Sequence, residues 1–278
     1  MFCQDAGVLR FAKYQGLGND FLVVDGRELA ATLSAAAVQR LCDRHHGVGA
    51  DGILTVWPTS GADARMQVQN ADGSEAAMCG NGLRCVARYL HDAGRLAAGA
   101  SLVTLRVGEG LYRCERRGTD RVRVAMGKAL FVHPDLPGPA VELESAGECF
   151  LASCVYIGNP HAVVFVDHAE PAQLAEQHGP ALEAHPAFPN RVNVSFARPR
   201  ADGFDVAVFE RGVGMTLACG SGASAVAAAA VRGERWPAGR AAVIHLPGGM
   251  LSIVVDATGE IWMEGETVRV FSGEVEAP

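Results

Sequence analysis

Two short stretches of the chain carry the same arrangement of residues suited to acid–base chemistry. Cys79 stands in AMCGNGLRCV, residues 77–86, and Cys219 stands in LACGSGASAV, residues 217–226. In both, the cysteine is followed by glycine, a polar residue and glycine, and then by a run that favours a helix. A thiol at a helix N-terminus lies beside backbone N–H groups that stabilise a thiolate, and the same groups can hold a carboxylate. The pattern therefore predicts a thiol and an anion site at each helix start.

Two such helix starts facing one small carboxylate would place a thiol on each side of its α-carbon. Inverting that carbon by proton transfer requires a base on one face and an acid on the other, and two cysteines with matched pKa values can exchange these roles. The N–H groups that hold the carboxylate also stabilise the negative charge that enters it when the α-proton leaves. This chemistry needs neither a metal nor pyridoxal phosphate, so we expect no cofactor.

An internal repeat relates the two stretches. Cys219 lies 140 positions after Cys79, and Asn159 in IGNPHAVV lies 140 positions after Asn19 in LGNDFLVV. Several matches at one shift indicate a duplication. The Pro-rich segment HPDLPGPA, residues 133–140, is where a linker between the two halves is expected.

The elements that must position these residues follow the same order in both halves, which predicts a strand-rich fold of α and β elements. Helical patterns cover residues 34–46, 82–94, 171–179 and the run after Cys219. Strand patterns cover residues 21–25, 53–57, 64–69, 101–107 and 121–126 in the first half, and residues 150–158, 161–167, 192–196, 204–210, 241–246, 251–255 and 260–264 in the second.

Composition narrows the partners. With 278 residues, 49% of them hydrophobic, the chain can bury one or two globular cores. Its net charge of −7 and the absence of a Lys/Arg block argue against nucleic acid and against an anionic membrane, which leaves a small molecule. No run is long and apolar enough to span a bilayer, and the start of the sequence does not resemble a secretion signal, so we expect a cytoplasmic protein. The cysteines outside the two helix starts are expected to be buried, reduced thiols: Cys3, Cys42, Cys85, Cys114, Cys149 and Cys154.

One motif is misleading. The segment GVGADG, residues 47–52, satisfies G-x-G-x-x-G, but it follows a helical pattern and leads into a strand, whereas a dinucleotide-binding loop must follow a strand and open a helix. His45 and His46 precede it without a set of further ligands at metal-binding spacing, so we expect solvated or capping histidines and no metal site.

The chain closely resembles the diaminopimelate epimerase family. The resemblance rests on GLGNDF, NADGSEAAMCGNGLRC, GNPH, RVNV, ERGVGMTLACGSGA and LPGGMLSI, which occur in this order and cover nearly the whole chain after about residue 11. It implies an α+β fold of two pseudo-symmetric domains, each a mostly antiparallel sheet wrapped round a central helix, with the active site in the cleft between them. It also implies cofactor-independent interconversion of L,L- and meso-2,6-diaminopimelate, in lysine and peptidoglycan-precursor biosynthesis. A homodimer is the assembly that we expect.

The resemblance assigns roles residue by residue. Cys79 and Cys219 correspond to the base and acid thiols. The helix-start residues that bind the reacting carboxylate correspond to Gly80, Asn81, Gly220 and Ser221. The residues that bind the rest of the substrate correspond to Asn19, Asn70, Asn159, Asn193, Glu210 and Arg211. His161, together with Glu210, corresponds to the groups that tune the thiols.

The chain also departs from the family pattern. Gly52 stands where some members have a glutamine that contacts the substrate, so no contact is carried over there. Met215 occupies a position that is often acidic or polar in the family. Near the end of the chain, WMEGETV, which contains residues 264–266, replaces the TGPA-like stretch that is more usual there. The residues before Leu9 look like an additional tail. Because the last strand commonly returns to the first domain, we expect domains of residues 1–130 plus 266–278 and of residues 131–265.

Two other functions stay open at this stage. A proline racemase or hydroxyproline epimerase resembles the chain in fold and in its two cysteines, but the polar set of Asn70, Asn193 and Arg211 suits a substrate with a charged far end better than a closed ring. A thiol redox or binding protein of the same fold would not exchange an α-proton with solvent.

Overall fold

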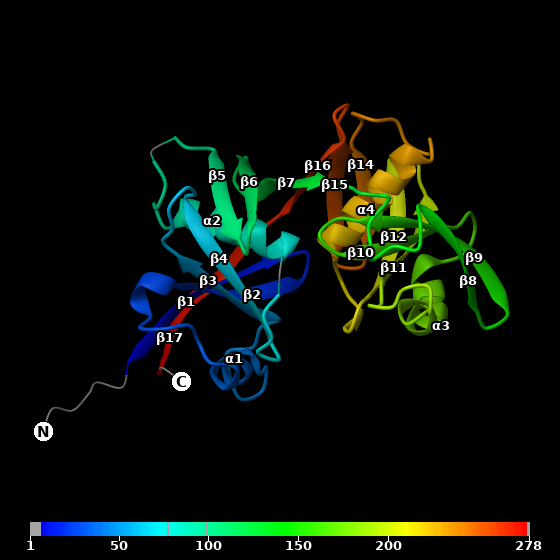
Figure 1. Ribbon diagram of the computed structural model, residues 1–278. Coiled ribbons are helices and arrows are strands. Elements are labelled where there is room, and N and C mark those ends of the chain that lie inside the picture. The colour runs from blue at the N-terminus through cyan, green and yellow to red at the C-terminus, as the bar shows by residue number, and fades with distance from the viewer. Residues whose placement is uncertain (1–6, 77, 98, 277–278) are drawn as a thin grey trace, which may run out of the picture. The chain divides into compact units, whose positions relative to one another are not determined.

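The computed structural model describes residues 7–76, 78–97 and 99–276 (Figure 1). Its contacts divide the chain into two compact units. Unit 1 contains the described residues up to Val124 together with those from Glu266 onward, and unit 2 contains Ala125–Gly265. The division places the return of the chain to unit 1 at its last strand.

Unit 1 is built from one twisted sheet and two α-helices. Its strands are β1 (Val8–Gly16), β2 (Asn19–Asp25), β3 (Gly52–Trp57), β4 (Ala64–Asn70), β5 (Leu102–Val107), β6 (Gly110–Arg117), the first half of β7 (Arg121–Lys128) and β17 (Val268–Glu276). Its helices are α1 (Ala35–Cys42) and α2 (Gly80–Asp92), with a short 3₁₀ turn at Gly26–Glu28. Neighbouring strands are antiparallel except for β2–β3 and β4–β5, which are parallel. In Figure 1 the red β17 lies beside the blue β1, as their antiparallel register requires.

Unit 2 repeats this plan. Its strands are β8 (Ala140–Ser145), β9 (Glu148–Tyr156), β10 (Pro160–Phe165), β11 (Asn193–Pro199), β12 (Gly203–Glu210), β13 (Gly214–Met215), β14 (Ala242–Leu246), β15 (Gly249–Val255) and β16 (Glu260–Glu266). Its helices are α3 (Pro171–Glu183) and α4 (Gly220–Arg232). The parallel pairs are β10–β11 and β12–β14, at the places equivalent to those in unit 1.

The two central helices show the repeat most clearly. Helices α2 and α4 both have 13 residues, and α4 begins 140 positions after α2. Residues 220–230 of α4 are all buried, and this stretch is rich in alanine because a helix enclosed by its own sheet has room only for small side chains. The predicted α+β class, with a mostly antiparallel sheet and a central helix in each half, is confirmed.

The outer helices complete the two cores. In unit 1, α1 packs Val38 and Leu41 against Leu22 and Ile53 of the sheet. Its start is fixed by Ser34, whose Oγ accepts the N–H of Ala37 at 3.2 Å, an ordinary N-cap. In unit 2, the core residues Leu182 and Phe188 join Phe150, Phe196 and Leu143.

Several local predictions require correction. The helix predicted over residues 34–46 ends at Cys42, because the Asp43 carboxylate accepts the backbone N–H groups of His45 and His46 and holds them in a turn. Strands β1, β6, β8 and β13 were not predicted. Cys149 is exposed rather than buried, whereas Cys42, Cys85, Cys114 and Cys154 are buried as expected, and Cys3 lies outside the described residues.

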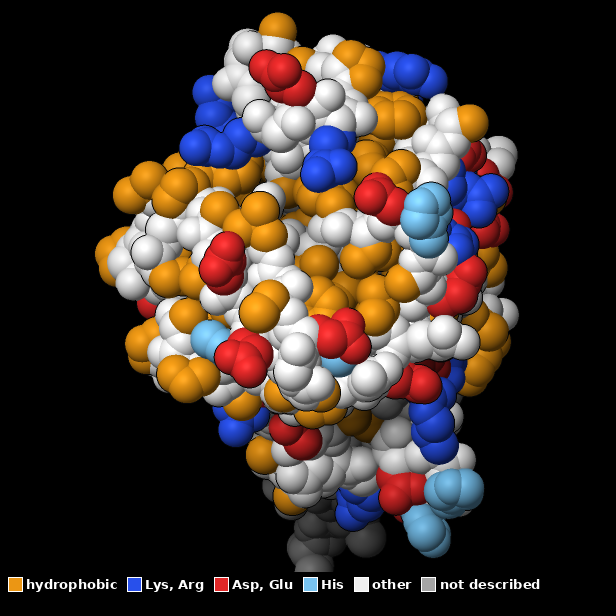
Figure 2. All heavy atoms as spheres, turned by 90° about the vertical axis from the view of Figure 1, so that its right-hand side faces the viewer, with side chains coloured by type: hydrophobic (Ala, Val, Ile, Leu, Met, Phe, Trp, Pro, Cys, Tyr) orange, Lys and Arg blue, Asp and Glu red, His pale blue; other side chains and the backbone are white. Residues whose placement is uncertain are grey.

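Charged and apolar side chains are mixed on one face of the molecule (Figure 2). On the face drawn in Figure 2, Lys and Arg side chains are scattered among acidic and apolar ones instead of forming a block. Within residues 7–76, 78–97 and 99–276, no helix has both the length and the apolar character needed to cross a membrane.

Candidate active site

Both predicted thiols cap a helix. Cys79 precedes α2 with an extended backbone, φ −142° and ψ 107°, and Cys219 precedes α4 with φ −119° and ψ 106°. The Sγ of Cys79 accepts the N–H of Gly82 at 3.3 Å, and the Sγ of Cys219 accepts the N–H of Gly222 at the same distance. Each sulfur therefore sits at the positive end of a helix, where a hydrogen bond from a backbone N–H favours negative charge.

The second glycine of each motif allows this close approach. A Cβ on Gly82 would lie 3.1 Å from Leu54 Cδ2 and 3.3 Å from Cys79 Cβ. A Cβ on Gly222 would lie 3.1 Å from Val208 Cγ2 and 3.2 Å from the Sγ of Cys219. The sequence spacing of Cys-Gly-x-Gly is thus explained by packing against both the sheet and the capping cysteine.

In unit 1, side-chain bonds connect the start of β2 with the start of α2. Asn19, the first residue of β2, donates its Nδ2 to Asp51 Oδ2 at 2.8 Å, and its Oδ1 accepts Asn81 Nδ2 at 3.1 Å. Gly80 and Asn81 are buried. Asn70, the last residue of β4, is exposed and donates instead to Ser74 Oγ at 3.0 Å.

Unit 2 brings the equivalent residues together, although here the asparagine donates to the helix start. Asn159 donates its Nδ2 to Ser221 Oγ at 3.5 Å, and Ser221 Oγ lies 3.5 Å from the Sγ of Cys219. Gly220 and Ser221 are buried at the start of α4, where they follow the cap. The contacts Asn19–Asn81 and Asn159–Ser221 span the same sequence separation, so the repeat extends to the polar side chains.

Asn193 and Arg211 form a second part of the unit 2 site. The buried Asn193 donates its Nδ2 to the Pro160 carbonyl at 2.9 Å, and its Oδ1 accepts the backbone N–H of Arg211 at 3.0 Å. The Arg211 side chain is exposed, and one guanidinium nitrogen donates to the Asn190 carbonyl at 3.3 Å. The remaining edge of the guanidinium can thus receive a carboxylate.

Burial and the neighbouring Glu210 both raise the pKa of Cys219. Burial raises the pKa of Glu210, against hydrogen bonds from Thr216 Oγ1, at 2.6 Å, and from Cys219. Burial, and then the charge of Glu210, raise the pKa of Cys219 well above its ordinary value, although Ser221 and the Gly222 N–H act in the other direction. A pKa raised in this way favours the protonated thiol of Cys219 at neutral pH.

His161 is held neutral. Its side chain is fully buried, and burial together with the charge of Arg211 lowers its pKa to about 3. Its Nε2 lies 2.8 Å from Asn159 Oδ1, and in the part of the chain that the structure describes its Nδ1 has no hydrogen-bond partner. The bond observed for His161 is thus to a predicted substrate-binding asparagine.

This buried histidine predicts an acid-sensitive fold. Between pH 6.5 and about 3 the unfolded chain protonates His161 while the folded chain does not, so stability is lost as pH falls below 6.5, at up to about 1.4 kcal/mol per pH unit. His161→Gln removes this contribution. Urea unfolding at pH 7, 6 and 5 should therefore show the stability difference between the parent and the variant shrinking toward low pH, and a constant difference would contradict a neutral buried His161.

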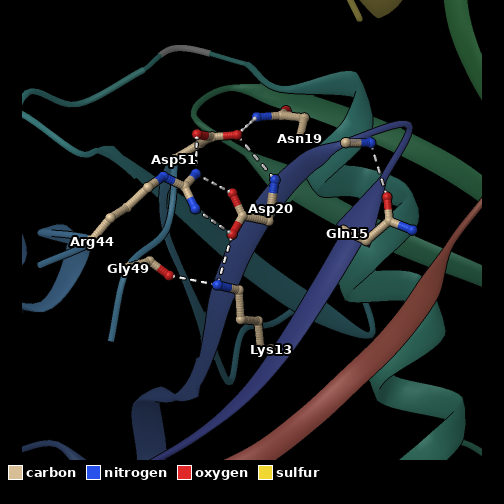
Figure 3. Close-up of polar contacts among 8 residues, drawn as sticks. Lys13, Gln15, Asn19, Asp20, Arg44, Gly49 and Asp51 are labelled. Carbon is tan, nitrogen blue, oxygen red and sulfur yellow. Dashed lines mark hydrogen bonds and ion pairs between the residues drawn. The ribbon is translucent and has the colours of Figure 1, made fainter. Parts of the chain in front are cut away.

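Asp51, in the segment GVGADG, is a site residue that was not predicted from the sequence. Figure 3 shows its carboxylate between Asn19 and Arg44, with Asp20 and Lys13 beside them. The parallel pairing of β2 with β3, in which Phe21 faces Gly52, brings Asp51 next to Asn19. The sequence did contain a signal, because Asp51 is an acidic residue just before a predicted strand. The segment that contains it was not considered further once it had been rejected as a dinucleotide-binding loop.

The structure shows the surroundings of Gly52 and Met215, two residues that depart from the family pattern. A Cβ on Gly52 would lie 2.5 Å from the Gln69 carbonyl oxygen, so this backbone leaves no room for a side chain there. Met215 lies in the short strand β13, opposite Phe209, and its side chain is partly exposed.

The described residues contain no group of three or more His, Cys, Asp or Glu side chains arranged to hold a metal ion. A cavity of about 200 Å³ in unit 1 is lined by β1, β2, β17 and the end of α2, with Tyr14, Tyr89 and Arg269 among its residues. None of the candidate site residues lines it.

Solved structures share this fold. A hydroxyproline epimerase from Agrobacterium vitis, with bound trans-4-hydroxy-L-proline, matches with a TM-score of 0.72 and 18% identity over 99% of this chain and 94% of that one. A probable proline racemase from Agrobacterium radiobacter matches with a TM-score of 0.71 and 18% identity over 96% and 92%. The fold is therefore the one found in these racemases and epimerases. At 18% identity, the proline racemase and the hydroxyproline epimerase that were considered as alternatives are similar to this chain in fold alone.

Sequence comparison narrows this class. The family model described as "Diaminopimelate epimerase" matches residues 11–132 and 153–270, and the chain belongs to this family. A diaminopimelate epimerase from Synechococcus elongatus is 42% identical over 96% of this chain and 98% of that protein. One from Rhodospirillum centenum is 43% identical over 96% and 92%, and a chloroplastic one from Oryza sativa is 40% identical over 95% and 79%. The resemblance drawn from the motifs is confirmed.

Proposed function

We propose that the protein epimerises L,L-2,6-diaminopimelate to the meso isomer at its α-carbon, without a cofactor, in lysine and peptidoglycan-precursor biosynthesis. The observation that carries the proposal is the pair of thiol-capped helix starts, which repeats at a shift of 140 residues in a chain of this family. The substrate class is a small amino acid.

Two thiols divide the proton transfer. One cysteine, as thiolate, takes the α-proton, and the other, as thiol, gives a proton to the opposite face of the carbon. One proton leaves and one enters, so the substrate changes only its configuration and each sulfur ends in the other's starting state. Because burial and then the charge of Glu210 raise the pKa of Cys219, Cys219 begins as the acid for the isomer whose α-proton faces Cys79.

The helix starts would hold the charge that moves during the reaction. In this proposal the reacting carboxylate binds the backbone N–H groups at Gly80, Asn81, Gly220 and Ser221. These groups carry partial positive charge, and they stabilise the negative charge that enters the carboxylate as the α-proton leaves.

The other polar residues suit the rest of the substrate. The open edge of the Arg211 guanidinium is shaped to bind the distal carboxylate with two parallel hydrogen bonds. The amides of Asn19, Asn70, Asn159 and Asn193 and the carboxylate of Glu210 offer oxygen acceptors to ammonium groups.

The test follows both stereochemistry and label. The protein is incubated in D₂O with L,L-diaminopimelate, and the isomers are separated and their deuterium content measured. We expect meso product carrying deuterium at the inverted carbon. Inversion of L-proline or trans-4-hydroxy-L-proline in place of diaminopimelate would favour the alternative enzyme, and no exchange with any of these substrates would favour a thiol redox or binding protein.

The assembly, the domains and the location belong to the same proposal. We propose a cytoplasmic homodimer whose domains are residues 1–130 plus 266–278 and residues 131–265. Size-exclusion chromatography with light scattering measures the assembly, and a mass of one chain at working concentration would remove the dimer from the proposal.

A further inference from the structure

The two equivalent asparagines are held by partners of opposite kind. Asn19 donates to the carboxylate of Asp51, whereas Asn159 contacts the imidazole of His161 through its oxygen. Each asparagine then uses its other end to contact the second residue of a central helix, Asn81 in α2 or Ser221 in α4. The two halves therefore have an asparagine at the same position, but its amide oxygen and NH₂ group point in opposite directions.

In unit 1 the direction is set by Asp51. An ionised carboxylate can only accept hydrogen bonds, so Asn19 must direct its NH₂ group to Asp51, at 2.8 Å. The amide oxygen of Asn19 consequently points to Asn81, whose Nδ2 it accepts at 3.1 Å. If Asn19 turned over, its NH₂ group would face the NH₂ group of Asn81 and this bond would be lost.

The carboxylate of Asp51 contacts the backbone of β2 and a half-exposed arginine. Its Oδ1 lies 2.7 Å from an Arg44 nitrogen, and its Oδ2 also accepts the N–H of Asp20 at 3.1 Å. Arg44 and Lys13 both pair with the Asp20 carboxylate, at 2.6 Å and 2.7 Å, and Lys13 donates to the Gly49 carbonyl as well. Figure 3 shows these contacts. The oxygen that meets Asn19 is the one that accepts the Asp20 N–H, whereas Arg44 contacts the other oxygen from a half-exposed side chain.

In unit 2 the direction is reversed. His161 is buried and neutral, and its Nε2, with its proton, donates to Asn159 Oδ1. The NH₂ group of Asn159 therefore points to Ser221, whose hydroxyl oxygen accepts it. The start of α2 thus meets an amide oxygen where the start of α4 meets an amide NH₂ group.

We propose that Asp51 is a positioning residue of the reaction, which turns the oxygen of Asn19 toward the start of α2 and so gives the Cys79 half of the site a polarity opposite to that of the Cys219 half. The proposal rests on the proposed function, since it assigns Asn19 and Asn81 to the substrate. It accounts for a carboxylate at the end of GVGADG, a segment with no other role in the site.

The experiment compares two variants of one network. Asp51→Asn keeps the size of the side chain but can donate to Asn19, which frees the amide to turn. Arg44→Gln removes the ion pairs to Asp20 and Asp51 and leaves the carboxylate as the acceptor for Asn19. We expect Asp51→Asn to lower kcat/KM for L,L-diaminopimelate about tenfold or more, the scale of one charge-assisted hydrogen bond. We expect Arg44→Gln to stay within about threefold of the parent, because its contact is at a partly exposed surface.

Thermal melting separates positioning from folding. Both variants lose network contacts, so both melting temperatures should fall, but only Asp51→Asn should lose most of its activity. Equal losses of kcat/KM in the two variants, or full activity in Asp51→Asn, would overturn the proposal. A parent protein without activity would instead overturn the proposed function, so the two failures are distinguishable.

A double variant keeps the test informative if Asp51→Asn folds poorly. Asn19→Asp alone places two carboxylates together and should lower kcat/KM. Combining Asn19→Asp with Asp51→Asn restores one donor and one acceptor, because the new carboxylate at position 19 presents an oxygen to Asn81 and accepts a hydrogen bond from the new amide at position 51. We expect the double variant to be at least about threefold more active than Asn19→Asp, and no recovery would count against a role of Asp51 in setting this polarity.

Discussion

Replacing either Cys79 or Cys219 by alanine is expected to lower kcat/KM for epimerisation about 10³-fold in both directions. The loss has this size because positioned acid–base groups contribute about 10²–10⁴-fold, and each variant lacks the base for one isomer and the acid for the other. The measurement is the rate of conversion between L,L- and meso-diaminopimelate, started from each isomer separately.

Exchange of the α-proton with solvent should fall less than epimerisation does. The remaining thiol can still remove the proton that faces it and return a deuteron to the same face, which labels the starting isomer without inverting it. Cys79→Ala and Cys219→Ala should therefore label opposite isomers in D₂O. Cys149→Ala is the matched control, because Cys149 is exposed on β9 and is no part of the site, and it should retain parental activity. Substantial epimerisation by either site variant would show that one group serves both faces.

Arg211→Lys is expected to lower kcat/KM for diaminopimelate about 10- to 100-fold. An ammonium group cannot reproduce the two parallel hydrogen bonds of a guanidinium with a carboxylate, and the loss of a charge-assisted hydrogen bond costs about 1.5–3 kcal/mol. In the part of the chain that the structure describes, one nitrogen of the exposed guanidinium donates to the Asn190 carbonyl, and its other nitrogens can bind a carboxylate. Steady-state kinetics with the purified variant measure the effect.

Arg200→Lys is the control for replacing a guanidinium by an ammonium group. Arg200 is exposed and pairs with Asp205 at the hairpin between β11 and β12, so its replacement should leave kcat/KM within about twofold, as for a surface ion pair. Should Arg211→Lys behave like Arg200→Lys, the distal carboxylate is bound by another residue.

Some features of the protein follow from local sequence alone. The Cys-Gly-x-Gly stretches specify a cap and a helix within a few residues, because capping bonds and helical propensity act between near neighbours along the chain. The same locality made α2, α4 and most of the strands recognisable, and the 140-residue shift relates the two halves without any knowledge of their contacts.

Other features come only from contacts between distant parts of the chain. Asp51 meets Asn19 because β2 and β3 pair in parallel across the segment that contains α1, and no spacing in the sequence expresses that register. Strand β1 was missed because its burial depends on β17, which lies at the other end of the chain. The helix predicted to reach His46 ends at Cys42, because the Asp43 carboxylate accepts the backbone N–H groups of His45 and His46 in competition with the helical hydrogen bonds.

The amino-acid order is thus enough to identify the two thiols that cap helices and to show that their surroundings are duplicated. The sequence does not show which way the amide oxygen and NH₂ group of Asn19 and Asn159 point. That orientation is set by the group that the fold places against each amide. In unit 1 that group is the carboxylate of Asp51, and in unit 2 it is the buried, neutral imidazole of His161. The charge of Cys219 likewise comes from the fold, since the pKa of a thiol depends on the solvent and carboxylate around it rather than on its neighbours in sequence.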